Sequence, residues 1–91
     1  GSYLVNTSRG GTVNEQDLYE ALKSGHLAGA AMDVIEKEPM PADHPLLSIP
    51  NFTMTPHMGM YSEEAVGAVS LICAQNVAAM AKGEPLKFQV V

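Results

Sequence analysis

The segment Leu27–Ile35 limits most strongly what this chain can fold into. It is a continuous apolar run in which Asp33 is the only charged side chain. Such runs are typical of strands that are buried on both faces, as in parallel sheets. A carboxylate inside a buried strand is costly unless it has partners. Asp33 therefore predicts either a functional group or a structural hydrogen-bonding role.

The residues before this run predict the other two elements of a βαβ unit. Tyr3–Val5 is a short apolar strand that leads into a polar, glycine-rich stretch from Asn6 to Gly11. A helix follows, with Asn14 as its N-cap and Gly25 just after its end. Strand, helix and strand within about 30 residues predict a parallel pair with a right-handed crossover.

The remaining sequence predicts a third strand and a long helix. Residues 36–51 contain four prolines, which predict a long irregular loop. Phe52–Thr55 alternates in polarity and predicts a short strand. Ser62 is a suitable N-cap for a helix that continues to Lys82. Apolar residues recur along this helix and alanine fills many other positions, so we expect other structure to cover nearly all of it.

Each predicted strand leads to unusual polar side chains. Arg9, the only arginine, follows the first strand, Asp33 lies in the second, and His57 follows the third. The carboxyl ends of parallel strands share one edge of a sheet, where ligands of open α/β sheets bind. Glu36 and Glu38, after the second strand, are both candidates to orient the histidine. Together these groups suit proton-coupled chemistry on a small anionic substrate.

Each feature alone also has an ordinary structural interpretation. The glycine-rich stretch after the first strand is compatible with a simple turn, Glu36–Pro39 with a solvated charge run, and Pro56–His57 with a plain loop. Asp33 is compatible with a role in capping a neighbouring loop. We expect no metal site, because the three histidines and the single cysteine lack ligand spacing.

Charge and composition restrict the cellular role. Five Lys and Arg against ten Asp and Glu give a net charge of −5 without a basic stripe, so we expect no nucleic-acid binding. We also expect no membrane span, because the apolar segment 65–81 contains Ser70, Gln75, Asn76 and six alanines. The single cysteine, Cys73, excludes an internal disulfide and suits a cytoplasmic location.

Taken together, the motifs resemble the C-terminal half of the cofactor domain in D-isomer-specific 2-hydroxyacid dehydrogenases. Their order and spacing agree with that family over residues 3–64. The matching stretches are Leu-Val-Asn-Thr-Ser-Arg-Gly-Gly at 4–11, His-Leu-Ala-Gly-Ala-Ala-Met-Asp-Val at 26–34, Glu-Lys-Glu-Pro at 36–39, Ala-Asp-His-Pro-Leu-Leu at 42–47 and Asn-Phe-Thr-Met-Thr-Pro-His at 51–57.

The resemblance implies an α/β fold with two parts. Residues 1–61 would form the C-terminal half of a Rossmann-type NAD(P)-binding domain, with a partial parallel sheet made of a βαβ unit and a third strand. Residues 62–91 would form the long C-terminal helix and a tail, which pack on a substrate domain in the family.

The resemblance also assigns roles to the polar residues. The family's catalytic Arg, Glu and His match Arg9, Glu38 and His57, which selects Glu38 over Glu36. Arg9 would bind the carboxylate of a small 2-oxo acid, and His57 would exchange a proton with its carbonyl oxygen while a nicotinamide transfers hydride. Glu38 would pair with His57 and favour the imidazolium. The residues implied to contact NAD or NADP are Thr7, Ser8, Arg9, Asp33, His57 and Gly59.

One departure and two alternatives follow from the same comparison. The G-x-G-x-x-G fingerprint is absent, since Gly10 and Gly11 do not form it. We therefore expect a C-terminal fragment that binds NAD(P) weakly and is inactive alone, and whose uncovered helix favours a homodimer. The alternatives are a non-enzymatic, NAD-sensing interaction module like the family's corepressor relatives, and a formate- or phosphite-oxidising relative. Glu38 disfavours the formate branch, which usually carries an amide there.

Overall fold

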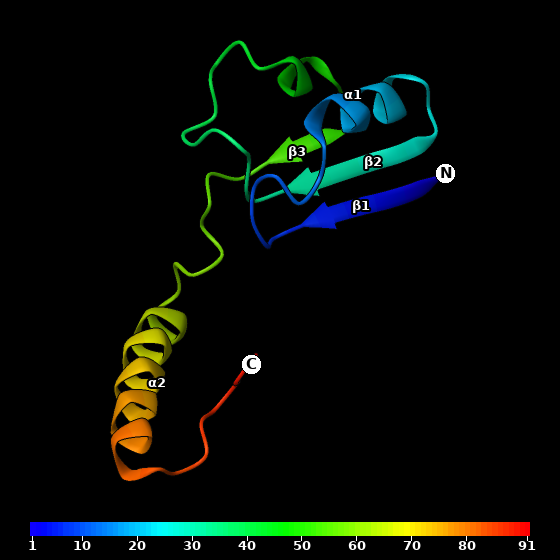
Figure 1. Cartoon of the computed structure of the whole chain (residues 1–91). Coiled ribbons are helices and arrows are strands. Elements are labelled where there is room, and N and C mark those ends of the chain that lie inside the picture. Colours follow the sequence, from blue (N-terminus) through cyan, green and yellow to red (C-terminus); the bar gives the residue numbers. More distant parts are fainter. The chain divides into compact units, whose positions relative to one another are not determined.

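The first part of the protein is a small parallel sheet with its helices on one side (Figure 1). The computed structural model describes all 91 residues. Strands β1 (Ser2–Asn6), β2 (Leu27–Met32) and β3 (Phe52–Met54) lie in the order β1-β2-β3, and both neighbouring pairs are parallel. Helix α1 (Glu15–Lys23) connects β1 to β2. The predicted partial Rossmann-like sheet is confirmed.

Local sequence signals set the limits of α1. The Asn14 side chain accepts a hydrogen bond from the backbone N–H of Asp17 at 3.0 Å, which satisfies one free amide of the first turn. Beyond the helix, Gly25 has a φ of 78°, in the left-handed region that ends many helices. Leu18 and Leu22, one turn apart, are buried and form the apolar stripe of the helix.

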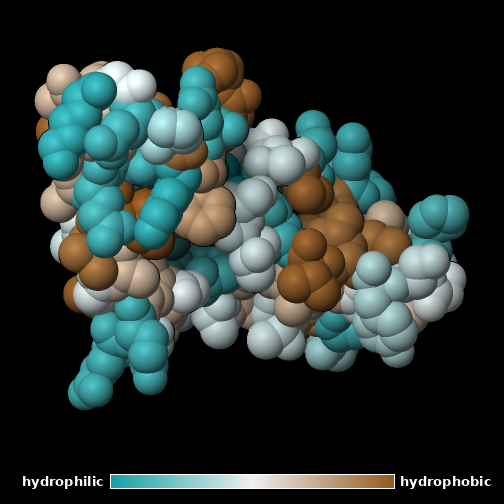
Figure 2. Space-filling model, turned by 90° about the horizontal axis from the view of Figure 1, so that it is seen from below, coloured by the Kyte–Doolittle hydropathy of each residue, from teal (hydrophilic) through white to brown (hydrophobic).

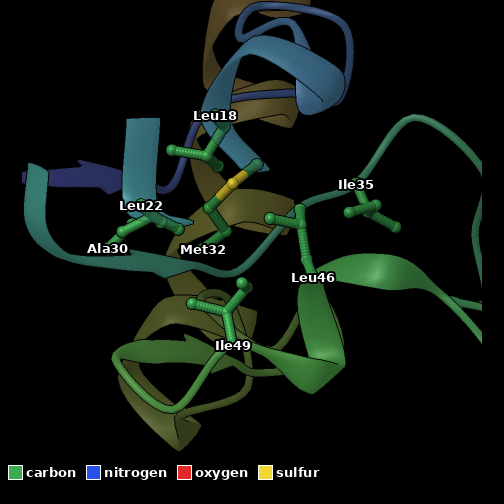
Figure 3. Packing of buried hydrophobic residues seen from close by; sticks show 7 residues of the cluster. All are labelled: Leu18, Leu22, Ala30, Met32, Ile35, Leu46 and Ile49. Carbon is green, nitrogen blue, oxygen red and sulfur yellow. The ribbon is translucent and has the colours of Figure 1, made fainter. Parts of the chain in front are cut away.

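The hydrophobic core lies between α1, β2 and the short 3-10 helix η1 (Pro45–Ser48), whose side chains point toward one another in Figure 3. The prediction of an irregular loop over 36–51 is wrong at η1. There Pro45 starts a helical turn, and Nδ1 of His44 accepts the N–H of Leu46 at 3.2 Å. The core cluster consists of Leu18, Leu22, Ala30, Met32, Ile35, Leu46 and Ile49.

The two faces of the sheet have different environments. Met32 and Ala30 belong to the core on the side of α1. On the opposite face, Tyr3 and Val5 are 78% and 71% exposed, and Figure 2 shows hydrophobic surface, in brown, that is open to solvent. On this second face β2 itself is partly covered, because Gly29 is buried and Ala31 is half-buried, so the prediction of burial on both faces holds only in part. The strand also ends at Met32 instead of Ile35.

Residues Met60–Val91 form a second unit, while the sequence predicts a boundary after residue 61. Helix α2 (Glu63–Lys82) begins at Ser62, whose hydroxyl accepts the N–H of Ala65 at 3.0 Å, and it ends at Gly83. The tail then returns to the helix. The Asn76 side chain accepts the N–H of Lys87 at 3.0 Å and donates to its carbonyl oxygen at 3.2 Å.

The surface of α2 differs from what the sequence predicts. None of its residues is buried, so the expected cover is absent from the structure. With 20 residues and a mean hydropathy of 1.4, α2 is long and apolar enough to cross a membrane. The polar residues alone therefore do not exclude a span, because the aliphatic side chains outweigh them, and the expectation of no span stays a prediction. Core helices of soluble proteins meet the same criterion, so this property assigns no location.

The core suggests a direct test of stability. Leu46 is completely buried, whereas its neighbour Leu47 is 49% exposed. We expect Leu46→Ala to lower the free energy of unfolding by about 2–5 kcal/mol, because it leaves a cavity in the core. Leu47→Ala should change it by less than about 0.5 kcal/mol. Urea denaturation of both variants measures the difference, and equal effects would contradict this account of the core.

Candidate active site

Glu38 and His57 meet at the carboxyl edge of the sheet. Nδ1 of His57 lies 2.8 Å from Oε2 of Glu38, a hydrogen-bonding distance. Glu38 lies in the loop after β2 and His57 follows β3, so the parallel arrangement brings together residues that are 19 positions apart. The side chains of His57 and Glu38 are 40% and 38% exposed. The pair is therefore accessible to a ligand.

The Glu38 carboxylate determines where His57 carries its proton. The hydrogen bond from His57 holds the pKa of Glu38 below its ordinary value of 4.5, and the Ile35 amide and the charge of Arg9 act in the same direction. Glu38 is then ionised near neutral pH and can only accept. The proton of a neutral His57 therefore resides on Nδ1, and Nε2 is the atom that can exchange a proton with a ligand.

The backbone of His57 has an unusual conformation. Its φ is 54°, in the left-handed region that residues with side chains seldom adopt. Its N–H donates to the carbonyl oxygens of Asp33 at 2.8 Å and of Thr55 at 3.0 Å. Such a conformation costs about 1–3 kcal/mol and persists only where the surroundings hold it, which is common at functional sites.

Asp33 is buried directly after β2 and organises the loop that carries His57. Its Oδ1 accepts from the Thr55 hydroxyl at 2.5 Å and from the Met58 amide at 2.8 Å, and its Oδ2 accepts from the Gly59 amide at 2.9 Å. The Thr55 and Met58 hydrogen bonds hold the pKa of Asp33 below its ordinary value of 3.8. The structure thus shows the loop-capping role, while the cofactor-binding role of Asp33 stays a prediction.

Arg9 follows β1 at the same edge of the sheet. Its Nη1 donates to the carbonyl oxygen of Ser8 at 2.7 Å. The buried Asn6 side chain holds this loop, since it accepts the N–H and the hydroxyl of Ser8 and donates to the Arg9 carbonyl oxygen. Among the three predicted catalytic residues, the only direct contact is between Glu38 and His57.

Gly10 brings the loop after β1 against the chain that leads to Glu38. A Cβ atom on Gly10 would lie 2.1 Å from the carbonyl oxygen of Ile35. Any larger residue would force the two backbones apart. A glycine at this position therefore keeps Arg9 and Glu38 at neighbouring points of the site.

Two hollows lie near these groups. A cavity of about 210 Å³ is lined by Glu38, Pro39, Met54, Pro56 and His57. A smaller hollow of about 90 Å³ includes Thr7, Asp33 and Thr55 in its lining. Two of the predicted cofactor residues, Thr7 and Asp33, therefore share one surface at the strand ends, while Ser8 is turned toward Asn6 and Gly59 toward Asp33.

Sequence reasoning missed the role of Thr55 at the site and the contacts of His44 elsewhere in the fold. Thr55 shows only as the last residue of an alternating strand, and nothing in that pattern indicates its hydrogen bond to Asp33. His44 has no evident partner in the sequence, yet its Nε2 lies 3.7 Å from Oε2 of Glu15 in the first turn of α1. No group of three or more His, Cys, Asp or Glu side chains is placed to hold a metal ion.

The sequence of this chain matches a known protein family over most of its length. The family described as D-isomer specific 2-hydroxyacid dehydrogenase, NAD binding domain, matches residues 1–59, which include the whole candidate site. The chain belongs to this family. The family resemblance found in the sequence is thereby confirmed.

Individual members of the 2-hydroxyacid dehydrogenase family are similar over nearly the whole chain. D-3-phosphoglycerate dehydrogenase of Archaeoglobus fulgidus is 47% identical over 96% of this chain and 16% of its own length. Human glyoxylate reductase/hydroxypyruvate reductase is 44% identical over 91% of this chain and 25% of its own length. The chain thus spans a quarter or less of these two relatives.

A solved structure supports the same fold. The D-isomer specific 2-hydroxyacid dehydrogenase from Xanthobacter autotrophicus, in complex with NADPH and MES, aligns with a TM-score of 0.78 and 35% identity. The alignment covers 100% of this chain and 37% of the other chain. The partial Rossmann-like architecture is therefore that of the family.

The lowered pKa values predict how stability depends on pH. Asp33 and Glu38 release their protons more readily in the folded chain, so the unfolded chain binds more protons below about pH 4.5. Their stabilising contribution is complete above that pH and is lost as the pH falls through the lower folded values. We expect the urea midpoint to fall between about pH 5 and pH 3, and Asp33→Asn to remove part of this fall.

The matched control is Asp43→Asn, which changes an exposed aspartate of the same chain. This variant should keep the pH dependence of the wild type. An Asp33→Asn variant whose midpoint follows the wild-type curve would show that Asp33 makes no special contribution.

Proposed function

We propose that this chain supplies the C-terminal half of the NAD(P)-binding domain of an oxidoreductase. The enzyme would transfer a hydride between the cofactor and the carbonyl carbon of a small 2-oxo acid. The observation that carries the proposal is the hydrogen-bonded His57–Glu38 pair at the carboxyl edge of a parallel sheet. The relatives named as glyoxylate/hydroxypyruvate reductase and 3-phosphoglycerate dehydrogenase support this substrate class.

The residues at the strand ends fit NAD or NADP. Oδ2 of Asp33 accepts one hydrogen bond, so it retains acceptor capacity for an amide N–H. Thr7 is exposed beside it in the same hollow. When bound, the nicotinamide supplies the hydride transfer. The family description, NAD binding domain, supports NAD, whereas the related structures in complex with NADPH and NADP support NADP.

Arg9 and His57 have complementary roles in this proposal. Only one N–H group of the Arg9 guanidinium is engaged, by the Ser8 carbonyl oxygen, so the others are available for a substrate carboxylate. Nε2 of His57 donates a proton to the substrate oxygen during reduction and removes it during oxidation. Glu38 keeps the other ring nitrogen protonated and compensates the positive charge that the ring acquires.

The proposal is tested by His57→Gln in the full-length enzyme. We expect the variant to lose about 10²–10⁴-fold in kcat, because the general acid is removed, while its dissociation constant for the cofactor changes little. Steady-state kinetics with glyoxylate and hydroxypyruvate, together with calorimetry for NADH and NADPH, measure both quantities.

The two glutamates of the same loop provide a matched control. Glu38→Gln should lower kcat, whereas Glu36→Gln, at an exposed residue outside the His57–Glu38 pair, should leave kcat unchanged. Full kcat in His57→Gln would refute the role of His57 as the general acid. A wild-type protein without turnover, whose partner affinity is kept in His57→Gln, would favour an NAD-sensing interaction module instead.

We also propose that the protein acts as a homodimer in the cytoplasm, without nucleic-acid or membrane partners. The apolar surface of α2, none of which is buried, supports association, and the net charge of −5 disfavours nucleic acid. The single cysteine, Cys73, is unpaired, as suits a reducing compartment. Analytical ultracentrifugation of the protein should show a dimer. A strictly monomeric profile at high protein concentration would exclude the homodimer.

A further inference from the structure

We propose that Thr55 is a positioning residue for His57 and that it acts through the carboxylate of Asp33. The proposal rests on the proposed function for the catalytic role of His57. The structural connection between the three residues is independent of that role.

Thr55 joins the rigid sheet to Asp33. Its backbone N–H donates to the carbonyl oxygen of Met32 at 3.0 Å, which continues the ladder between β3 and β2. Because this bond fixes its backbone, the Thr55 side chain has a defined direction. Its hydroxyl donates to Oδ1 of Asp33 at 2.5 Å, the shortest hydrogen bond that this carboxylate makes.

Asp33 in turn receives three consecutive backbone amides. The N–H of His57 donates to its carbonyl oxygen, and those of Met58 and Gly59 donate to Oδ1 and Oδ2. The Met58 and Gly59 amides converge on the carboxylate, as in anion-binding nests, where the backbone alternates between right- and left-handed conformations. The left-handed φ of 54° at His57 fits this requirement.

The fixed backbone determines where the imidazole lies. With His57 held in this conformation, its Nδ1 reaches Oε2 of Glu38 at 2.8 Å and Nε2 is left for a ligand. Gly59 allows the close approach, since a Cβ atom there would lie 3.1 Å from Oδ2 of Asp33. Removal of the Thr55 hydroxyl should therefore increase the mobility of the Asp33 side chain. The loop that Asp33 holds would then become more mobile, and with it the ring of His57.

Two substitutions at one position test this connection. Thr55→Val removes the hydroxyl and keeps the side-chain shape, whereas Thr55→Ser keeps the hydroxyl. In the 91-residue chain, NMR hydrogen exchange of the Met58 and Gly59 amides reports their bonds to Asp33. We expect exchange to be at least about tenfold faster in Thr55→Val and nearly unchanged in Thr55→Ser. The three-bond coupling of His57 should show that φ leaves the left-handed region in Thr55→Val alone.

Thr53→Val is the matched control, because Thr53 lies in β3 two residues before Thr55 and its side chain is exposed. It should leave both amides and the His57 coupling unchanged. Exchange of the α1 amides verifies that each variant is folded. If Thr55→Val does not fold, Thr55→Ala removes the same hydroxyl without added bulk and should give the same result. Unchanged exchange in a folded hydroxyl-free variant would overturn the proposal.

Kinetics of the full-length enzyme separate positioning from cofactor binding. We expect Thr55→Val to lower kcat about tenfold with little change in the KM for cofactor, and Thr55→Ser to restore it. A raised KM for cofactor with an unchanged kcat would overturn the positioning role. Inactivity of the wild-type enzyme toward 2-oxo acids would refute the proposed function, whereas the NMR result would still decide the link between Thr55 and His57.

Discussion

The geometry of the candidate site depends on the hydrogen bonds that Asp33 accepts. This one residue receives the Thr55 hydroxyl and three consecutive amides of the loop after β3. The buried carboxylate is stable because the Thr55 hydroxyl and the Met58 and Gly59 amides compensate its desolvation, while the His57 amide bonds to the Asp33 carbonyl oxygen. In return, the loop is held in a conformation that places the His57 ring against Glu38. Asp33, whose burial alone would be unfavourable, thus holds the loop that positions His57.

Parallel strand order brings the remaining groups to the same edge. β1 leads to Arg9, the chain beyond β2 leads to Glu38, and β3 leads to His57. Gly10 lets the first of these loops contact the second without a clash. The charges of Arg9 and His57 both favour the ionised form of Glu38 and lower its pKa. The site is therefore an electrostatic unit assembled from three loops that are distant in sequence.

Two apolar surfaces stay exposed in the structure, one on the sheet and one along α2. Tyr3 and Val5 on one face of the sheet are largely exposed, and no residue of α2 is buried, although both segments are rich in apolar side chains. The curated relatives described above are at least four times longer than the segment they share with this chain. Burial depends on what is packed against an element as well as on its composition.

The sequence by itself determined the order of the elements, the caps of both helices at Asn14 and Ser62, and the family. These features follow from local rules, since caps, glycine turns and apolar periodicity act within a few residues. For Asp33, the sequence left open whether the residue is a functional group or has a structural hydrogen-bonding role. Only the tertiary structure revealed the 3-10 turn at Pro45, the link from Thr55 to Asp33 and the left-handed His57. The Thr55 link and the His57 conformation depend on hydrogen bonds to Asp33, which is far away in the chain, so no local pattern encodes them. The turn at Pro45 is capped locally by His44, but this cap was not recognised in the sequence.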